Sequence, residues 1–284
     1  MQLEFNNIRR LAADIRIHTI RALEKFGAGH IGGCMSIADV LAVLYGRVMR
    51  YQAEKPDWDE RDLLVISKGH CGPAQYAALA LSGFFPMDWL DTLNLGGTRL
   101  PSHCDRNKTP GVDATTGSLG QGISVACGFA QAAVLQGKKN LTYALVGDGE
   151  LQEGQVWEAV QFAVSRRLGR LIILVDKNGK QLDGRTISEE IDLFGKFASF
   201  GCGVHTVNGH DVKAMTTLLE QIRDRSDDGK PVVVILETVK GCGCIFAEEQ
   251  ELNHHMPVSA EDAKRAIDEI ERRVAEKLLP GGTL

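Results

Sequence analysis

Short runs of apolar residues alternate along the chain with longer segments in which apolar residues recur every three or four positions. Continuous apolar runs of this length are typical of strands buried on both faces, and they fall at 63–66, 141–146, 171–175, 204–207 and 232–236. The longer segments predict amphipathic helices over about 4–26, 36–49, 73–83, 120–136, 153–168, 188–199, 210–225 and 259–278. This alternation predicts an α/β fold: a doubly wound parallel sheet with helices on both faces.

The domain organisation follows from what interrupts this pattern. No repeat, low-complexity tract or long linker divides the chain, so we expect one domain over residues 1–284, with a tail and a final helix from about 240. The stretch 84–118 is rich in Gly, Pro, Thr and Asn and predicts a long irregular segment. An irregular segment of that length in a compact domain is usually functional.

Composition and charge narrow the class of partner. The chain is 44% hydrophobic and 24% charged, with a formal net charge of −5, so it lacks the basic field that binds nucleic acid. Charged residues interrupt the N-terminal segment, and no apolar run has the length needed to span a bilayer. We therefore expect a cytoplasmic protein that acts on small molecules, with no nucleic acid or membrane partner.

The seven cysteines are odd in number and scattered, which favours free thiols in a reducing compartment. Cys242 and Cys244 form a lone Cys-x-Cys pair. A tetrahedral zinc site would need a second pair of ligands, so buried or loop thiols are the favoured interpretation.

Polar residues follow two consecutive strands of the predicted sheet. Gly147-Asp148-Gly149 comes directly after one strand, and Asn178 comes shortly after the next. Because ligands bind at the carboxyl ends of parallel strands, both side chains are expected at one edge. A carboxylate, an amide oxygen, a main-chain carbonyl and two phosphate oxygens would suit octahedral Mg²⁺. An Asp between glycines is also common in ordinary turns, and that alternative stays open for the motif taken alone.

The segment GDGELQEGQVWEA, followed about thirty residues later by LIILVDKN, resembles the signature of thiamine diphosphate enzymes. The resemblance implies thiamine diphosphate as cofactor, with Mg²⁺ (or Ca²⁺ or Mn²⁺) held by Asp148, Asn178 and the carbonyl of Lys180. In this segment it implies cofactor-binding roles for Gly147, Asp148, Gly149, Glu150, Glu153 and Asn178. Glu153 and Glu158 also fall near the family's contact between modules, although two exposed carboxylates at a helix start would be unremarkable.

Three further segments resemble the transketolase branch of these enzymes. They are AGHIGGCMSIADVLAVLY, RDLLVISKGHCGPAQYAALA and LPSHCDRNKTPGVDATTGSLGQGISVACGFA. The resemblance extends from about residue 8 to 240, and TTGSLGQG is its most specific block. It implies the diphosphate-binding, N-terminal part of a transketolase, known as the PP module.

The resemblance also implies roles for residues in these segments. His30 and His103 would face the donor hydroxyls, because imidazoles transfer protons well near neutral pH. His70 would lie against the diphosphate. A single histidine is more often structural, but three in three matching motifs favour function. Gly117 and Leu119 would lie beside the cofactor rings, and Ser118 between them would also bind the cofactor. A catalytic role is assigned to the late pair, His254 and His255, without deciding which one takes the family's late active-site position.

The sequence departs from the transketolase pattern on the substrate side. Ile31 stands where Pro is usual, and Ser102 and Cys104 replace Gly and Pro around His103. The family's late Trp-His becomes Asn-His-His at 253–255. These departures leave the identity of the sugar open.

In the family, the pyrimidine pocket and the glutamate that activates the cofactor lie on a second module. The resemblance therefore implies a split transketolase, in which a separate C-terminal, pyrimidine-binding subunit completes an α₂β₂ assembly. The expected reaction moves a two-carbon ketol unit from a ketose, free or phosphorylated, to an aldose. Two alternatives stay open: the alpha-type subunit of a 2-oxoacid dehydrogenase, and a non-catalytic regulatory subunit that binds the cofactor.

Overall fold

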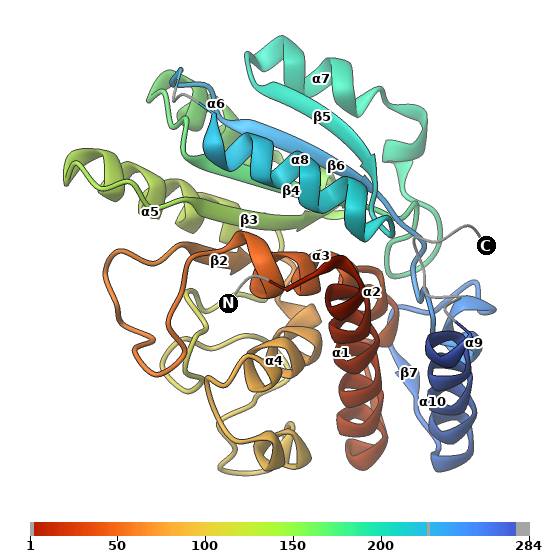
Figure 1. Ribbon diagram of the computed structural model, residues 1–284. Coiled ribbons are helices and arrows are strands. Elements are labelled where there is room, and N and C mark those ends of the chain that lie inside the picture. The colour runs from red at the N-terminus through yellow and green to blue at the C-terminus, as the bar shows by residue number, and fades with distance from the viewer. Residues whose placement is uncertain (1–2, 226–227, 277–284) are drawn as a thin grey trace.

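The computed structural model describes residues 3–225 and 228–276. Within them lies a parallel sheet of five strands in the order β2-β3-β4-β6-β5 (Figure 1). The strands are β2 (Leu63–Ile66), β3 (Thr142–Gly147), β4 (Leu171–Lys177), β5 (Gly203–Asn208) and β6 (Val232–Glu237). Each apolar run became one of these strands, with ends no more than two residues from the predicted ones. The predicted parallel sheet is confirmed.

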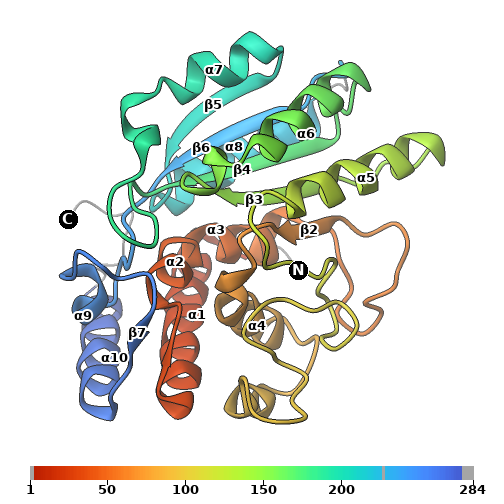
Figure 2. The ribbon, with the colours of Figure 1, turned by 180° about the vertical axis from the view of Figure 1, so that it is seen from behind.

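The two faces of the sheet support separate cores, because successive residues of a strand point to opposite sides. In β4, Ile173 and Val175 belong to one core, while Ile172 and Leu174 belong to the other. The first core is covered by α5 (Gly122–Leu135), α6 (Gly154–Ser165) and α7 (Leu193–Phe200). The second is covered by α1 (Phe5–Phe26), α3 (Ala38–Val43), α4 (Gly72–Leu81) and α8 (Val212–Asp224). Figures 1 and 2 show the helices on both sides, as predicted.

Two helix predictions need correction at their ends. The segment predicted as one helix over 36–49 is divided into α2 (Ile31–Ser36), α3 and a wider π turn, η1 (Leu44–Val48). The helix predicted from 188 begins at Leu193, after a short 3₁₀ turn, η5 (Ile187–Glu190). The side chain of Asp192 accepts a hydrogen bond from the Gly195 amide. This cap fixes the start of α7.

The segment after β6 returns to the N-terminal part of the chain. It contains α9 (Ile245–Glu248), β7 (Met256–Pro257) and α10 (Ala260–Ala275), and α10 packs against α1 (Figure 1). The tail and final helix were predicted, but β7 was not. It pairs antiparallel with β1 (Ala28–Gly29). Two-residue strands are too short to show an alternating pattern, so the sequence carries no readable signal for them.

A buried ion pair holds the start of this tail. Arg16 of α1 and Asp39 of α3 are 2% and 1% exposed. The Arg16 Nε donates to the carbonyl of Cys242 at 2.9 Å, and its guanidinium also donates to Asp39. On the other side of Asp39, the His210 Nδ1 lies 2.8 Å from its Oδ2. Helix α1 is thereby bonded to the loop that follows β6.

All seven cysteines are buried free thiols. None of the helices in the described ranges combines the length and apolar character needed to cross a membrane.

Candidate active site

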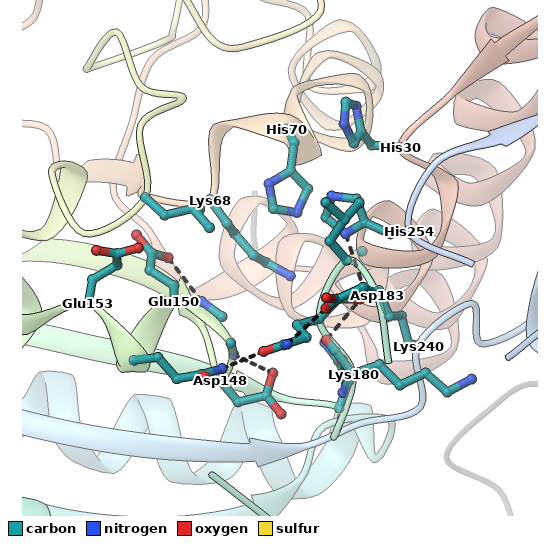
Figure 3. A pocket seen from close by; sticks show the side chains of 18 of the residues that line it. His30, Lys68, His70, Asp148, Glu150, Glu153, Lys180, Asp183, Lys240 and His254 are labelled. Carbon is teal, nitrogen blue, oxygen red and sulfur yellow. Dashed lines mark hydrogen bonds between the residues drawn. The ribbon is translucent and has the colours of Figure 1, made fainter. Parts of the chain in front are cut away.

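A cavity of about 420 Å³ opens at the carboxyl ends of β3 and β4. Its walls come from distant parts of the sequence. They are the start of α2, the loop after β2, the glycine-rich loop before α5, the ends of β3 and β4, and the tail. Figure 3 shows the charged groups at its floor and the histidines along its rim.

Asp148 lies at the floor of the cavity, because it directly follows the last residue of β3. This side chain is 2% exposed and lines the cavity. Its carboxylate accepts hydrogen bonds from the Gly149 amide at 2.9 Å and the Gly179 amide at 2.6 Å. Burial, together with the nearby charge of Asp176, raises the pKa of Asp148 to about 6. The bond to Gly179 joins the end of β3 to the loop after β4.

The end of β4 brings Asn178 to the same place. Its amide nitrogen donates to Asp176 at 2.8 Å, and its amide oxygen accepts from the Lys180 amide at 3.1 Å. Asn178, Lys180 and Asp148 all line the cavity. The structure therefore brings together the three residues that the sequence suggested as metal ligands.

Two lysines enter the cavity, and the sequence reasoning missed both. Lys68, 3% exposed, pairs with the fully buried carboxylate of Asp176. Burial opposes the charge on Lys68, but Asp176 raises the pKa of Lys68 overall. Lys240 donates to the carbonyls of Lys180 at 3.2 Å and Gln181 at 2.9 Å. Burial and the charge of Lys68 lower the pKa of Lys240 to about 8.

The two lysines differ in how easily the sequence could have revealed them. Lys68 lies inside the SKGH segment, two residues before His70, so its place in a cofactor motif was a signal. Lys240 begins the tail, about sixty residues after Asn178, and nothing local marks it. Only the return of the tail to the pocket brings it to the floor.

Glu150 organises three loops of the cavity. Its carboxylate accepts hydrogen bonds from the Ser67 hydroxyl, the Gly120 amide at 2.9 Å and the Gly147 amide at 3.1 Å. Glu150 is only 2% exposed, and burial raises its pKa. Its oxygens are engaged by the protein, so the geometry favours a supporting role, whereas the sequence suggested cofactor contact.

Four histidines line the cavity, and a fifth, His255, lies beside one of them, His30. The His30 ring lies 5.4 Å from the rings of His70 and His103, measured between centroids. It lies 5.2 Å from the His254 ring and 4.8 Å from the His255 ring. The structure thus places every histidine singled out in the sequence around His30.

Three of the rim histidines, His30, His103 and His254, have lowered pKa values. Burial and the neighbouring His70 lower the pKa of His30 to about 4. The same two causes, with Lys240 in addition, lower the pKa of His254 to about 3. Burial also lowers the pKa of His103. Neutral imidazoles can accept a proton near pH 7, and this is the state that general-base chemistry requires.

The late histidines occupy different positions. His254 lines the cavity, with its ring 4.7 Å from that of His70 and its Nδ1 3.4 Å from the Lys240 ammonium. His255 is exposed. Asn253, just before them, is buried, and its amide donates to the carbonyls of Lys240 and Ala247. Asn253 therefore anchors the turn from which both rings project.

Only part of the glycine-rich loop before α5 lines the cavity. Gly117 and Leu119 line the cavity, but Ser118 is exposed and is not among the lining residues. Gly122 packs against the SKGH segment so closely that a Cβ there would lie 2.6 Å from the Ser67 Cα. The remaining residues suggested for the cofactor, His70, Gly147, Gly149 and Glu153, line the cavity too.

Comparison with known proteins identifies the family to which this sequence and fold are similar. Residues 8–271 match the family described as transketolase, thiamine diphosphate binding domain. Subunit SqwG of the 6-deoxy-6-sulfo-D-fructose transketolase of Clostridium sp. (strain MSTE9) is 46% identical over 279 residues, which are 97% of this chain and 98% of the relative. One of the subunits of the apulose-4-phosphate transketolase of Actinobacillus succinogenes is 38% identical, over 94% of this chain and 97% of the relative.

One-chain transketolases match over only part of their length. The Homo sapiens transketolase is 34% identical over 97% of this chain but 44% of its own length. The solved structure of transketolase from Leishmania mexicana has a TM-score of 0.85 and 31% identity, over 97% of this chain and 42% of that one.

The fold and the site together define a thiamine diphosphate-binding α/β protein. This chain belongs to the transketolase family, whose thiamine diphosphate-binding domain it contains. The two relatives just described match along nearly their whole length and are named as subunits, so the chain corresponds to the N-terminal subunit of a split transketolase. The family assignment made from the motifs is thereby confirmed, and the protein is a transferase.

Proposed function

We propose that this chain binds thiamine diphosphate with Mg²⁺ and, joined by a pyrimidine-binding subunit, transfers a two-carbon ketol unit from a ketose to an aldose. One observation carries the proposal: buried cations and a buried carboxylate meet at neighbouring strand ends beneath a rim of histidines. The floor suits a phosphate-bearing cofactor, and the rim suits proton transfer on a sugar.

The floor can hold the diphosphate through this chain's own groups. Lys68 and Lys240 supply positive charge, and charge-assisted hydrogen bonds to phosphate are among the strongest available. The Gly149 amide precedes a short helical turn and can donate to an anion once Asp148 turns to a metal. His70 lies beside them. Gly117 and Leu119 are placed to contact the rings of the cofactor.

The donor set also fits a magnesium ion. Asp148 offers a carboxylate, Asn178 an amide oxygen and Lys180 a carbonyl, and Mg²⁺ prefers hard oxygen ligands of this kind. The Lys180 carbonyl already contacts a positive charge, because it accepts a hydrogen bond from the Lys240 ammonium. We therefore propose Asp148, Asn178 and the Lys180 carbonyl as ligands of Mg²⁺, with Ca²⁺ or Mn²⁺ as substitutes.

The rim residues would move protons during the reaction. Thiamine diphosphate supplies an electron sink that lets the carbon–carbon bond beside a ketone break. That cleavage requires a proton to leave a hydroxyl of the donor. His30 and His103 are neutral and close together, so they can accept it and return it to the acceptor aldehyde. His254 would hold the donor from the side of Lys240.

We propose that a pyrimidine-binding subunit covers this cavity and that two copies of each chain form an α₂β₂ enzyme in the cytoplasm. Exposed apolar side chains support such a contact, because they gather on α5 and on the loop beside the cavity. They include Val125, Leu135, Leu182 and Ile187, of which Leu135 is 79% exposed. The proposal also agrees with the naming of the relatives as subunits.

The relatives suggest the class of donor. One is named for 6-deoxy-6-sulfo-D-fructose and another for apulose-4-phosphate. Both sugars are ketoses with an anionic group. We propose that this enzyme, too, takes a ketose that carries a sulfonate or phosphate, while the floor of the cavity is reserved for the cofactor.

The test is calorimetric titration of thiamine diphosphate into the assembled two-chain complex, with and without Mg²⁺. We expect metal-dependent binding that is lost in Asp148→Ala and kept in Asp88→Ala, a change of an exposed carboxylate. Binding that is equally tight in excess chelator would contradict the metal site. Decarboxylation of pyruvate without cleavage of any ketose would instead favour a 2-oxoacid dehydrogenase subunit. Unchanged turnover in Asp148→Ala would favour a regulatory role.

A further inference from the structure

The short sheet of β1 and β7 sets two histidines side by side. The strands run antiparallel, with Ala28 opposite Pro257 and Gly29 opposite Met256. The next position of this ladder places His30 opposite His255. Their rings meet edge to face, with centroids 4.8 Å apart and planes at 84°. His255 therefore lies directly beside the end of this ladder.

His255 is the histidine that the rest of the site does not use. His254, its neighbour, lines the cavity between His70 and Lys240 and has the late-histidine position on the cofactor side. His255 is exposed on the other side of His30. Among the described residues, its ring contacts His30 and makes no side-chain hydrogen bond. Both ring nitrogens are thus available at the mouth of the site.

We propose that His255 is a specificity-determining residue that hydrogen-bonds the sugar chain of the donor beyond its ketol end. The inference rests on the proposed function, in which His30 faces the hydroxyls next to the bond that breaks. A group beyond His30, on the solvent side, meets the part of the donor that extends out of the cavity. Imidazole can donate and accept hydrogen bonds, as recognition of a polyhydroxylated chain requires.

The sequence context agrees with this role. The transketolase pattern has one histidine after its late Trp, whereas this chain has two histidines after Asn253. Since His254 lines the cavity, His255 is the additional residue. Two other departures from the pattern, Ile31 and Cys104, are buried in the core and do not line the cavity as the sequence suggested, whereas His255 is exposed beside His30.

The experiment compares two kinds of donor in the assembled complex loaded with thiamine diphosphate and Mg²⁺. The short donor is hydroxypyruvate, which delivers the same two-carbon unit but has no sugar chain beyond it. The long donors are D-fructose 6-phosphate and 6-deoxy-6-sulfo-D-fructose. The variants are His255→Ala and His255→Gln, with His205→Asn as a control, because His205 is exposed on β5 and lies outside the cavity.

We expect His255→Ala to raise KM for the long donors roughly tenfold, which is the value of one good hydrogen bond. The KM for hydroxypyruvate and the affinity for thiamine diphosphate should stay unchanged. His255→Gln, which keeps a donor and an acceptor, should recover part of the loss, and His205→Asn should match the wild type.

Equal changes for long and short donors, or a parallel loss of cofactor affinity, would show that His255 supports the structure of the site and would overturn the inference. So would an unchanged KM for the long donors. A wild-type complex that cleaves neither kind of donor would contradict the proposed function itself, and this result is obtained before any variant is compared.

Discussion

The floor and the rim of the cavity differ in the ionisable groups that they carry and in the molecules that these groups suit. At the floor, Asp148, Asp176 and Lys68 are almost wholly buried, and each ionic group has a fixed partner. At the rim, His30, His103 and His254 are partly exposed, and burial together with neighbouring side chains lowers their pKa values. Buried charge suits a permanent cofactor, while neutral imidazoles suit a substrate that arrives and leaves.

The difference teaches how one cavity can bind an anion and also transfer protons. If the rim were charged like the floor, His30 could not accept a proton from a sugar hydroxyl. If the floor were neutral like the rim, it could not offset the charge of a diphosphate. The two regions meet at Lys240 and His254, whose nitrogens are 3.4 Å apart.

The largest effect is expected at the rim. His103→Asn removes a neutral base while keeping a polar side chain, and general-base catalysis contributes about a hundredfold to ten-thousandfold. We expect kcat of the assembled enzyme to fall within that range, measured by steady-state transfer from a ketose. The affinity for thiamine diphosphate should not change, because the floor is untouched. A normal kcat would remove His103 from the catalytic set.

At the floor, the largest effect should be on stability. Lys68→Met leaves the fully buried carboxylate of Asp176 without its cation, and such a loss typically costs about 3–5 kcal/mol. Urea unfolding of the chain measures it. The matched control is Lys138→Met, because Lys138 pairs with Asp59 at the surface, where ion pairs contribute at most about 1 kcal/mol. Equal costs for the two variants would contradict the distinction between buried and exposed pairs.

Glu150→Gln tests whether Glu150 stabilises the loops to which it is hydrogen-bonded. The Gln amide nitrogen would face a backbone N–H in place of a carboxylate oxygen, so at least one buried donor loses its acceptor, at a cost of about 1–3 kcal/mol. The change should lower the free energy of unfolding and make the loop before α5 more sensitive to proteolysis. Glu54→Gln, at an exposed site, is the control. An unaltered loop would mean that Gly120 and Gly147 do not depend on Glu150.

The smallest effects should appear in pH profiles, and they should run in opposite directions. The pKa of Lys240 is lowered to about 8, so its charge is lost as the pH rises through 8, and diphosphate affinity of the free complex should weaken above that point. The pKa of His30 is lowered to about 4, so kcat/KM should keep its value below pH 6.5 and fall only toward pH 4. A fall in kcat/KM below about pH 6.5 would indicate that the His30 ring is exposed to water.

Most of the sheet could be predicted from the sequence because its strands are buried on both faces. Continuous apolar runs such as 171–175 mark such strands wherever they occur. Helix ends were less certain, since they depend on single side chains such as Asp192. The strands β1 and β7 were beyond prediction, because their pairing depends on residues more than two hundred positions apart.

The residues of the candidate site also differ in how well the sequence predicts them. Asp148 and Asn178 could be predicted because each follows a recognisable strand, and the three early histidines because each lies in a recognisable motif. Lys240 could not, since its position at the floor depends on the return of the tail. The supporting role of Glu150 was also hidden, because a sequence shows a carboxylate but not the amides that will occupy its oxygens.

The return of the tail through β7 limits how the protein can be shortened. Lys240 and His254 come from beyond the last strand of the large sheet, and the β1–β7 ladder holds that region against the first helix. A version that stopped after β6 would lose these two cavity residues and also Phe246, Val258 and Ile270, which belong to the core beside the first helix. The cavity would then lack one of its walls, so trimming for engineering must leave the chain intact through α10.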